Sequence, residues 1–277
     1  VDAWIARESK DRFMTELFKA LNKRFDVMEH YYRKESWDYF HCHIMDTDRI
    51  SHFFWEEMES GEGEYYKKFM DFFSVIDERL AKFYKMMAKD SALMILSDHG
   101  FCLAKKELYL NKWLEDEGYL KFDKPDPKSV EEMSPGTIAY SLIPGRIFIN
   151  LKGREQYGSV SPEDYEKYRD EIISKLSGLK DPETGDPVIS RVYKREDIYD
   201  GDYLDEVADL IAISPDGIDI KGNVKKDKLL ERGFISGMHT YDDAFLYVKS
   251  DLPEINVTGI RDCFNLVTEI MGVNKDE

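Results

Sequence analysis

Apolar side chains recur every four positions along residues 7 to 25, with Arg, Lys and Glu between them; they are Phe13, Leu17, Leu21 and Phe25. This spacing places one apolar stripe along a helix and so predicts an amphipathic helix. The same periodicity predicts helices at residues 50 to 58, 64 to 89 and 162 to 176. Ser161 fits the N-cap position of the last one. The phenylalanines of the helix at residues 64 to 89 are expected in the core; they are Phe69, Phe72, Phe73 and Phe83.

Short apolar runs alternate with these helical patterns. The densest, residues 92 to 96, contains no polar side chain and ends in Ser97-Asp98-His99-Gly100. An unbroken apolar strand is typical of a parallel sheet covered on both faces, where ligands lie beyond the carboxyl ends. Further strands are predicted at residues 38 to 45, 146 to 151, 208 to 214 and 244 to 248. Strands that alternate with helices indicate an α/β fold.

Turn-forming residues are concentrated between about 103 and 200, for example in Pro125-Asp126-Pro127 and Pro144-Gly145. Such clusters favour loops over regular elements. We therefore expect residues 1–277 to belong to one domain in which about 103–200 form an inserted or cap-like subregion.

Composition narrows the class of protein. The 277 residues are 42% hydrophobic, which indicates a globular chain, and carry a formal net charge of −17. A chain this acidic repels nucleic acids and anionic membranes, so neither is expected as a partner. No apolar run approaches the ~20 residues needed to span a bilayer. The oligomeric state is left open by these features.

The three cysteines have no paired spacing; they are Cys42, Cys102 and Cys263. This favours small apolar core residues in a reducing cytoplasm over a disulfide framework. The chain begins at Val1 with neither an initiator methionine nor a signal-like segment. We therefore expect it to start partway through a longer protein.

Two acid–imidazole pairs carry candidate metal chemistry. Asp98 and His99 follow the apolar run at residues 92 to 96, and Asp48 and His52 lie four positions apart on one face of a predicted helix. Carboxylates and imidazoles are both zinc ligands. Taken singly, Asp98 and His99 are equally explained by an Asp that caps a turn beside a partly exposed His. Asp48 and His52 alone are better explained as an exposed helical pair.

A third candidate is His239, which follows Gly237 by two positions. Glycine lets the backbone approach a crowded site closely. A single loop histidine is more often a surface residue, so the signal comes from its combination with the two acid–imidazole pairs.

The residues resemble a known family at these positions. Leu96-Ser97-Asp98-His99-Gly100-Phe101 is similar to the Ser-Asp-His-Gly signature of type I phosphodiesterases and nucleotide pyrophosphatases, within the alkaline phosphatase superfamily. Asp48 and His52 resemble the family's Asp-x-x-x-His, and His239 its late Gly-x-His. Longer segments resemble the branch of predicted phosphohydrolases and phosphomutases; they are residues 110 to 114, 146 to 154 and 199 to 201.

This resemblance implies an alkaline-phosphatase-like domain with a parallel-rich sheet between helices, and two divalent metal ions, zinc or alternatively manganese. Asp48, His52 and His239 would hold one ion, and Asp98 and His99 the other. The family's second ion also takes an Asp from the first strand and a Thr or Ser nucleophile at a helix start. Nothing here matches them, because the hydroxyls of Ser9 and Thr15 follow no predicted strand.

We therefore expect the nucleophile, with the N-terminal part of the fold, to lie upstream of Val1, and no catalytic nucleophile in this chain. The implied activity of the intact protein is metal-dependent hydrolysis of small phosphate esters, nucleotides among them, by a two-metal in-line mechanism. A phosphoenzyme would form and then be hydrolysed. The chain alone is expected to be inactive. Two alternatives remain open: a phosphomutase using the same metals, and a metal-binding module without catalysis.

Other polar residues are weaker candidates. His41 and His43 flank Cys42, and strand alternation would place both histidines on one face and Cys42 on the other. We expect the two histidines to have structural roles or to support metal ligands rather than to bind a metal themselves. Residues 240 to 243, Thr-Tyr-Asp-Asp, depart from the family pattern after His239 and favour a solvated turn over carboxylate support for an imidazole. The basic side chains near the motifs are expected at the solvated surface rather than on phosphate; they are Arg49, Lys105, Lys106 and Arg146.

Overall fold

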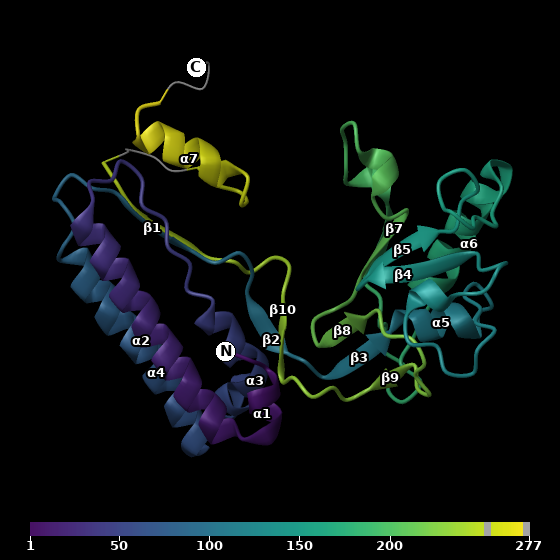
Figure 1. The fold of residues 1–277 in the computed structure, drawn as a ribbon, viewed down its shortest axis with the longest axis horizontal. Coiled ribbons are helices and arrows are strands. Elements are labelled where there is room, and N and C mark those ends of the chain that lie inside the picture. The colour runs from purple at the N-terminus through teal and green to yellow at the C-terminus, as the bar shows by residue number, and fades with distance from the viewer. Residues whose placement is uncertain (252–255, 274–277) are drawn as a thin grey trace. The chain divides into compact units, whose positions relative to one another are not determined.

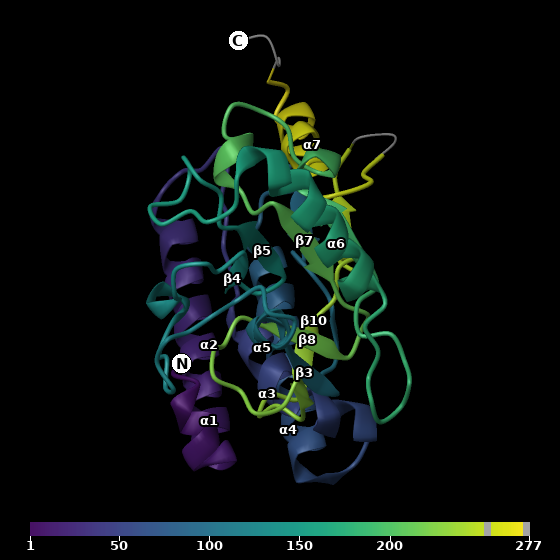
Figure 2. The same ribbon diagram turned by 90° about the vertical axis from the view of Figure 1, so that its right-hand side faces the viewer.

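The computed structural model describes residues 1–251 and 256–273, which divide into two compact units. Unit 1 comprises Val1–Leu103 and the described residues of Ile235–Glu277, and unit 2 comprises Ala104–Phe234. Both appear in Figures 1 and 2. Among the described residues, no helix is long and apolar enough to cross a membrane.

Unit 1 is mainly helical. Its helices are α1 (Trp4–Glu8), α2 (Lys10–Lys34), α3 (Asp46–Ser60), α4 (Gly63–Tyr84) and α7 (Asp262–Ile270). Its strands are β1 (Leu93–Leu96), β2 (Phe101–Leu103), β10 (Gly237–His239) and β11 (Leu246–Lys249). The long helices α2 and α4 lie side by side (Figure 1).

The amphipathic pattern explains α2. The four apolar positions that predicted it are at most 1% exposed, and they pack on α3 and α4; they are Phe13, Leu17, Leu21 and Phe25. Burial of each such side chain contributes about 1.5–3 kcal/mol. Ser9 starts the helix, because its hydroxyl accepts the Arg12 N–H at 3.2 Å. The prediction of this helix is confirmed.

The helix at residues 64 to 89 is confirmed as α4, which ends earlier, at Tyr84. Three of its four phenylalanines are buried as expected, whereas Phe73 is 37% exposed. The helix predicted at residues 50 to 58 is confirmed as part of α3. It ends at Gly61, whose φ of 71° is the left-handed conformation common after a helix end.

Unit 2 combines strands with two α-helices, α5 (Leu110–Asp116) and α6 (Tyr165–Ser177). Its strands are β3 (Lys106–Tyr109), β4 (Ala139–Ile143), β5 (Arg146–Ile149), β6 (Arg191–Lys194), β7 (Leu210–Ile213), β8 (Ile218–Lys221) and β9 (Leu230–Glu231). Short 3-10 helices are η1 (Val130–Glu132), η2 (Pro162–Asp164), η3 (Arg195–Asp197) and η4 (Leu204–Glu206). The sheets have the orders β4-β5-β7-β6 and β8-β3-β9, and α6 contacts β5 and β6 (Figure 2).

Two of the segments that carry the family resemblance stabilise unit 2. Buried Asn111 donates to the carbonyl oxygens of Ser141 and Gly222 at 2.8 and 2.7 Å. Arg154 makes two hydrogen bonds of 2.7 Å to the fully buried Asp209. Buried polar groups need such partners, so these residues have structural roles in unit 2.

The expected α/β class is confirmed, but the direction of strand pairing differs from the expectation. Among the described strands only β3 and β8 pair in parallel, and β1 pairs antiparallel with β11. An apolar run is typical of parallel strands covered on both faces but does not fix the direction of the neighbouring strand, and β1 itself is partly exposed, with Leu96 37% exposed. The strands predicted at 92 to 96, 146 to 151, 208 to 214 and 244 to 248 are confirmed with boundary shifts as β1, β5, β7 and β11.

Residues 38 to 45 do not form the expected strand, since they have no ladder partner among the described residues. Their apolar positions pack on unit 1 helices as an extended segment instead. The expectation that all three cysteines are core residues is also wrong: Cys42 is exposed and Cys102 and Cys263 are partly exposed, all as free thiols. The prediction of a cap-like subregion at about 103–200 stays a prediction.

Candidate metal centre

Three side chains from distant parts of the sequence meet in unit 1. His239 Nε2 lies 2.9 Å from Asp48 Oδ1 and 3.0 Å from His52 Nε2. His52 Nε2 in turn lies 3.3 Å from Asp48 Oδ1. These residues form the one group of three or more possible metal ligands found among the described residues. The sequence motifs placed these three side chains together correctly, whereas their role as ligands stays a prediction.

Helix α3 supplies two of the three side chains. Asp48 and His52 are four residues apart, so they lie one turn apart on the same face. The start of the helix is tied to α2, because Arg24 Nε donates to the buried Asp46 carboxylate at 2.8 Å. This fixes the first turn of α3, where Asp48 lies.

Strand β10 supplies His239 and packs directly on α3. A Cβ atom at Gly237 would lie 2.2 Å from the Ser51 carbonyl oxygen and 2.8 Å from Trp55 Cβ. The expectation that Gly237 permits a close backbone approach is therefore confirmed. On its other side β10 pairs with β2, which places His239 opposite Phe101.

A backbone hydrogen bond sets the tautomer of His52. Its Nδ1 lies 2.8 Å from the Gly237 carbonyl oxygen, which can only accept, so Nδ1 carries the proton. In the neutral ring Nε2 then presents a lone pair toward Asp48 and His239. Burial raises the pKa of Asp48, but its contacts with the His239 and His52 rings outweigh this effect and hold that pKa well below its usual range.

The donor set fits a divalent cation. The Nε2 lone pair of His52 and the Asp48 carboxylate face one point, and His239 Nε2 reaches both. A carboxylate and two imidazoles are typical zinc ligands, and a backbone carbonyl that holds the far ring nitrogen is the usual support for such an imidazole. Asp48, His52 and His239 would hold the ion.

The second predicted pair, Asp98 and His99, is less constrained. His99 Nε2 lies 3.6 Å from Asp98 Oδ1, and the Asp98 side chain is 77% exposed. His99 nevertheless adjoins the three-residue cluster, because its ring stacks on His239 with centroids 3.6 Å apart. The structure thus brings His99 beside the cluster.

Phe101 is a contact residue that sequence reasoning did not single out. Its ring centroid lies 5.1 Å from those of His52 and His239 and 5.4 Å from that of His99. Trp55 stacks on Phe101 at 5.5 Å. The available signal was its position directly after the Ser-Asp-His-Gly run.

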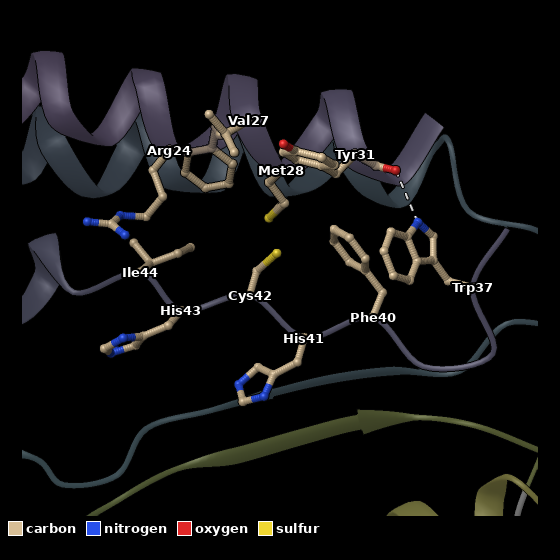
Figure 3. A pocket seen from close by; sticks show the side chains of 11 residues that line it. Arg24, Val27, Met28, Tyr31, Trp37, Phe40, His41, Cys42, His43 and Ile44 are labelled. Atoms are coloured by element: carbon tan, nitrogen blue, oxygen red, sulfur yellow. Dashed lines mark hydrogen bonds between the residues drawn. The ribbon is translucent and has the colours of Figure 1, made fainter. Parts of the chain in front are cut away.

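The other sequence candidates lie outside the three-residue cluster. Figure 3 shows a pocket beside α2 in which Cys42 points toward Met28 while His41 and His43 point the other way, as alternation predicts. Lys106 was expected at the solvated surface; it forms ion pairs with Asp181 and Glu183 instead, and its side chain is only 23% exposed.

The segment after His239 forms a bend that supports the turn interpretation. Asp243 accepts a hydrogen bond from the Thr240 hydroxyl rather than from an imidazole. Its carboxylate occupies the space beside Gly100, where a Cβ atom would lie 1.9 Å from Asp243 Oδ1. Gly100 therefore makes room for this bend.

A carboxylate and two imidazoles gathered by a helix and a late Gly-x-His strand define a candidate phosphoesterase metal centre. The chain belongs to the type I phosphodiesterase / nucleotide pyrophosphatase family, whose model matches residues 2–242. The matched span includes every predicted metal-binding residue. A search of curated proteins finds no match.

Two solved structures are similar to this chain. Both are phosphonoacetate hydrolase from Sinorhizobium meliloti 1021, one in complex with phosphonoacetate and one with phosphonoformate. They share 15% and 16% sequence identity with the chain, with TM-scores of 0.42 and 0.41. Each match covers 74% of this chain and 47% of the other, so the chain spans about half the length of these relatives.

Proposed function

We propose that this chain provides a divalent-metal centre for the hydrolysis of phosphate esters. The observation that carries the proposal is the convergence of Asp48, His52 and His239, from elements nearly two hundred residues apart, with donor atoms 2.9–3.3 Å from one another. Membership of the type I phosphodiesterase / nucleotide pyrophosphatase family supports phosphate esters as the substrate class.

Each predicted ligand has a role in this proposal. Asp48, His52 and His239 hold one ion, and Asp98 and His99 contribute to a second beside it. Zinc is the first candidate because of the imidazole-rich donor set, and manganese is the alternative. A pair of such ions stabilises the attacking and leaving oxygens of an in-line phosphoryl displacement.

The charge of the chain supports a requirement for metal. A formal net charge of −17 repels an anionic phosphate ester at long range. Bound dications are the largest local charges in such a site and reverse the sign there. The substrate we propose is therefore a small phosphate ester, nucleotides included, that binds only to the metal-loaded protein.

The experiment is hydrolysis of bis(p-nitrophenyl) phosphate by the full-length protein that contains these residues, after chelation and after addition of Zn²⁺ or Mn²⁺. Activity should require metal, and His239→Ala should abolish it. His30→Ala is the matched control, because His30 is exposed and lies on α2. Metal-independent activity, or an active His239→Ala variant, would contradict the proposal.

We also infer that the 277 residues alone hydrolyse phosphodiesters negligibly. The hydroxyls of the first 25 residues follow no strand: Ser9 caps α2, and Thr15 donates to the Asp11 carbonyl at 2.9 Å. Both are therefore engaged in helix structure. Robust metal-dependent turnover by the isolated chain would overturn this inference.

A further inference from the structure

Helix α3 is interrupted next to the metal centre. Phe54 has φ −133° and ψ 16°, which are not helical values, so α3 is kinked just after His52. In a regular helix the His52 carbonyl oxygen accepts a hydrogen bond from the backbone N–H of the residue four positions further on. The Trp55 N–H likewise donates to the Ser51 carbonyl oxygen. A kink changes the partners of these groups, and buried backbone groups must be satisfied elsewhere.

Ser236 meets both of these groups. Its N–H donates to the His52 carbonyl at 2.8 Å, and its hydroxyl oxygen accepts the Trp55 N–H at 3.1 Å. The hydroxyl also lies 3.5 Å from the His52 carbonyl oxygen. Ser236 is only 7% exposed, so water cannot readily replace these bonds.

The residues beside Ser236 extend the same attachment. The carbonyl oxygen of the next residue, Gly237, accepts a hydrogen bond from His52 Nδ1, and the Gly237 backbone lies against the Ser51 carbonyl. Two positions further along, His239 reaches Asp48 and His52. The link from Ser236 to α3 thus sets how far His239 extends along the helix.

We propose that Ser236 is a positioning residue for the metal centre. Its N–H and hydroxyl substitute for helical hydrogen bonds at the kink of α3, and so hold β10 in the register that brings His239 to Asp48 and His52. This inference rests on the proposed metal centre for its functional meaning. The geometry of Ser236, Gly237 and His52 exists without metal and can be tested separately.

The test compares Ser236→Ala with Ser236→Thr and with Ser214→Ala. Threonine keeps the hydroxyl. Ser214 is a matched control because it is also 7% exposed and its hydroxyl donates to a backbone carbonyl, that of Ile218, within unit 2. The probe is Co²⁺, titrated into each metal-free variant of the 277-residue chain and followed by visible absorption and calorimetry.

Ser236→Ala should weaken Co²⁺ binding about 10–100-fold, the range typical of residues that orient metal ligands. Ser236→Thr should restore most of the affinity, and Ser214→Ala should bind as the unchanged chain does. Unchanged affinity in Ser236→Ala, or equal weakening in Ser214→Ala, would overturn the proposal.

A second measurement separates this proposal from the metal-centre proposal. In the metal-free protein, ¹⁵N chemical shifts of the His52 ring should show one dominant tautomer, protonated at Nδ1. Ser236→Ala should mix the two tautomers, and Ser214→Ala should not. If the unchanged chain binds no Co²⁺ but the tautomer shift occurs, the metal centre is wrong and the positioning role stands. If the ring of His52 is identical in all variants, the positioning role is wrong.

Discussion

The two acid–imidazole pairs of this chain look alike in sequence and differ in structure. Asp48 and His52 lie on a helix, and a backbone carbonyl holds the His52 ring while His239 contacts both residues. Asp98 and His99 are adjacent in a loop, and His99 Nδ1 lies 3.1 Å from the carbonyl of its own neighbour, Gly100. Strand β10 therefore contacts both members of the first pair, whereas in the second pair it meets only His99, through the ring stack with His239, and leaves Asp98 exposed.

Solvent exposure differs at the carboxylates of the two pairs. The Asp48 side chain is 29% exposed and that of Asp98 is 77% exposed, whereas the His52 and His99 side chains are each 22% exposed. A carboxylate that is held in place before an ion arrives loses less entropy on binding. We therefore expect the first ion to bind at Asp48, His52 and His239 with higher affinity than any ion at Asp98 and His99.

The largest loss of stability and of Zn²⁺ affinity is expected from Gly237→Ala, which disturbs the cluster of Asp48, His52 and His239. The new Cβ atom would lie 2.2 Å from the Ser51 carbonyl oxygen, so β10 must move away from α3. Overpacking of this kind costs about 1–3 kcal/mol of unfolding free energy, and we expect metal binding to be lost with it.

Urea unfolding and calorimetric Zn²⁺ titration measure these two changes. Gly178→Ala is the control, because its Cβ atom would lie at ordinary contact distance, 3.6 Å, from Lys175 O. It should change stability by less than about 1 kcal/mol and leave Zn²⁺ affinity unchanged. Equal behaviour of the two variants would show that close packing at Gly237 is unimportant.

The next prediction compares the Zn²⁺ affinities of His239→Ala, which removes a ligand beside the first pair, and His99→Ala, which removes a member of the second pair. Loss of a ligand should weaken the first Zn²⁺ equivalent more than about 100-fold, beyond the effect of a supporting residue. For the first ion, His99→Ala removes a ring stacked on His239 and no proposed ligand, so it should weaken the first Zn²⁺ equivalent about 10-fold or less. Calorimetric titration measures both affinities. A larger loss of affinity in His99→Ala than in His239→Ala would mean that the first ion binds at Asp98 and His99.

A smaller effect is expected from Phe101→Leu. The Phe101 ring contacts the rings of His52, His99 and His239, and leucine keeps apolar bulk while it removes these ring contacts. We expect Zn²⁺ affinity to fall about 10-fold, the low end for residues around a metal site. Phe122→Leu, which alters the unit 2 core, should leave Zn²⁺ affinity unchanged in the same titration.

The smallest changes in stability and Zn²⁺ affinity are expected from Glu196→Gln. Glu196 lies in unit 2 and belongs to neither acid–imidazole pair. Burial raises its pKa, but hydrogen bonds from Arg169 outweigh this and lower it from 4.5 to about 2. Because the folded pKa lies below the unfolded one, the stabilisation is complete above about pH 4.5 and is lost as the pH falls toward 2.

Glu196 is 43% exposed, so Glu196→Gln should cost no more than about 1 kcal/mol at pH 7. The difference from the unchanged chain should shrink in urea unfolding below pH 4.5. Zn²⁺ affinity at pH 7 should not change. A change in Zn²⁺ affinity as large as that of Phe101→Leu would mean that the titration lacks specificity for the site.

The sequence identified the members of the ordered site because their chemistry depends on residue type and spacing. Helical periodicity put Asp48 and His52 on one face, and glycine marked the close approach of β10. It did not identify Ser236 or Phe101, because their roles come from tertiary contacts with α3 and with the histidine rings. Nor did it predict the antiparallel partner of β1, since apolar content does not encode strand direction.

Anomalous diffraction from crystals of the chain equilibrated with Zn²⁺ tests the central claim most directly. We predict that the strongest zinc peak lies within about 2.0–2.2 Å of Asp48 Oδ1, His52 Nε2 and His239 Nε2. Any second peak, at Asp98 and His99, should have lower occupancy. A strongest peak elsewhere, for example at His41 and His43, or no peak at the three-residue cluster, would contradict it.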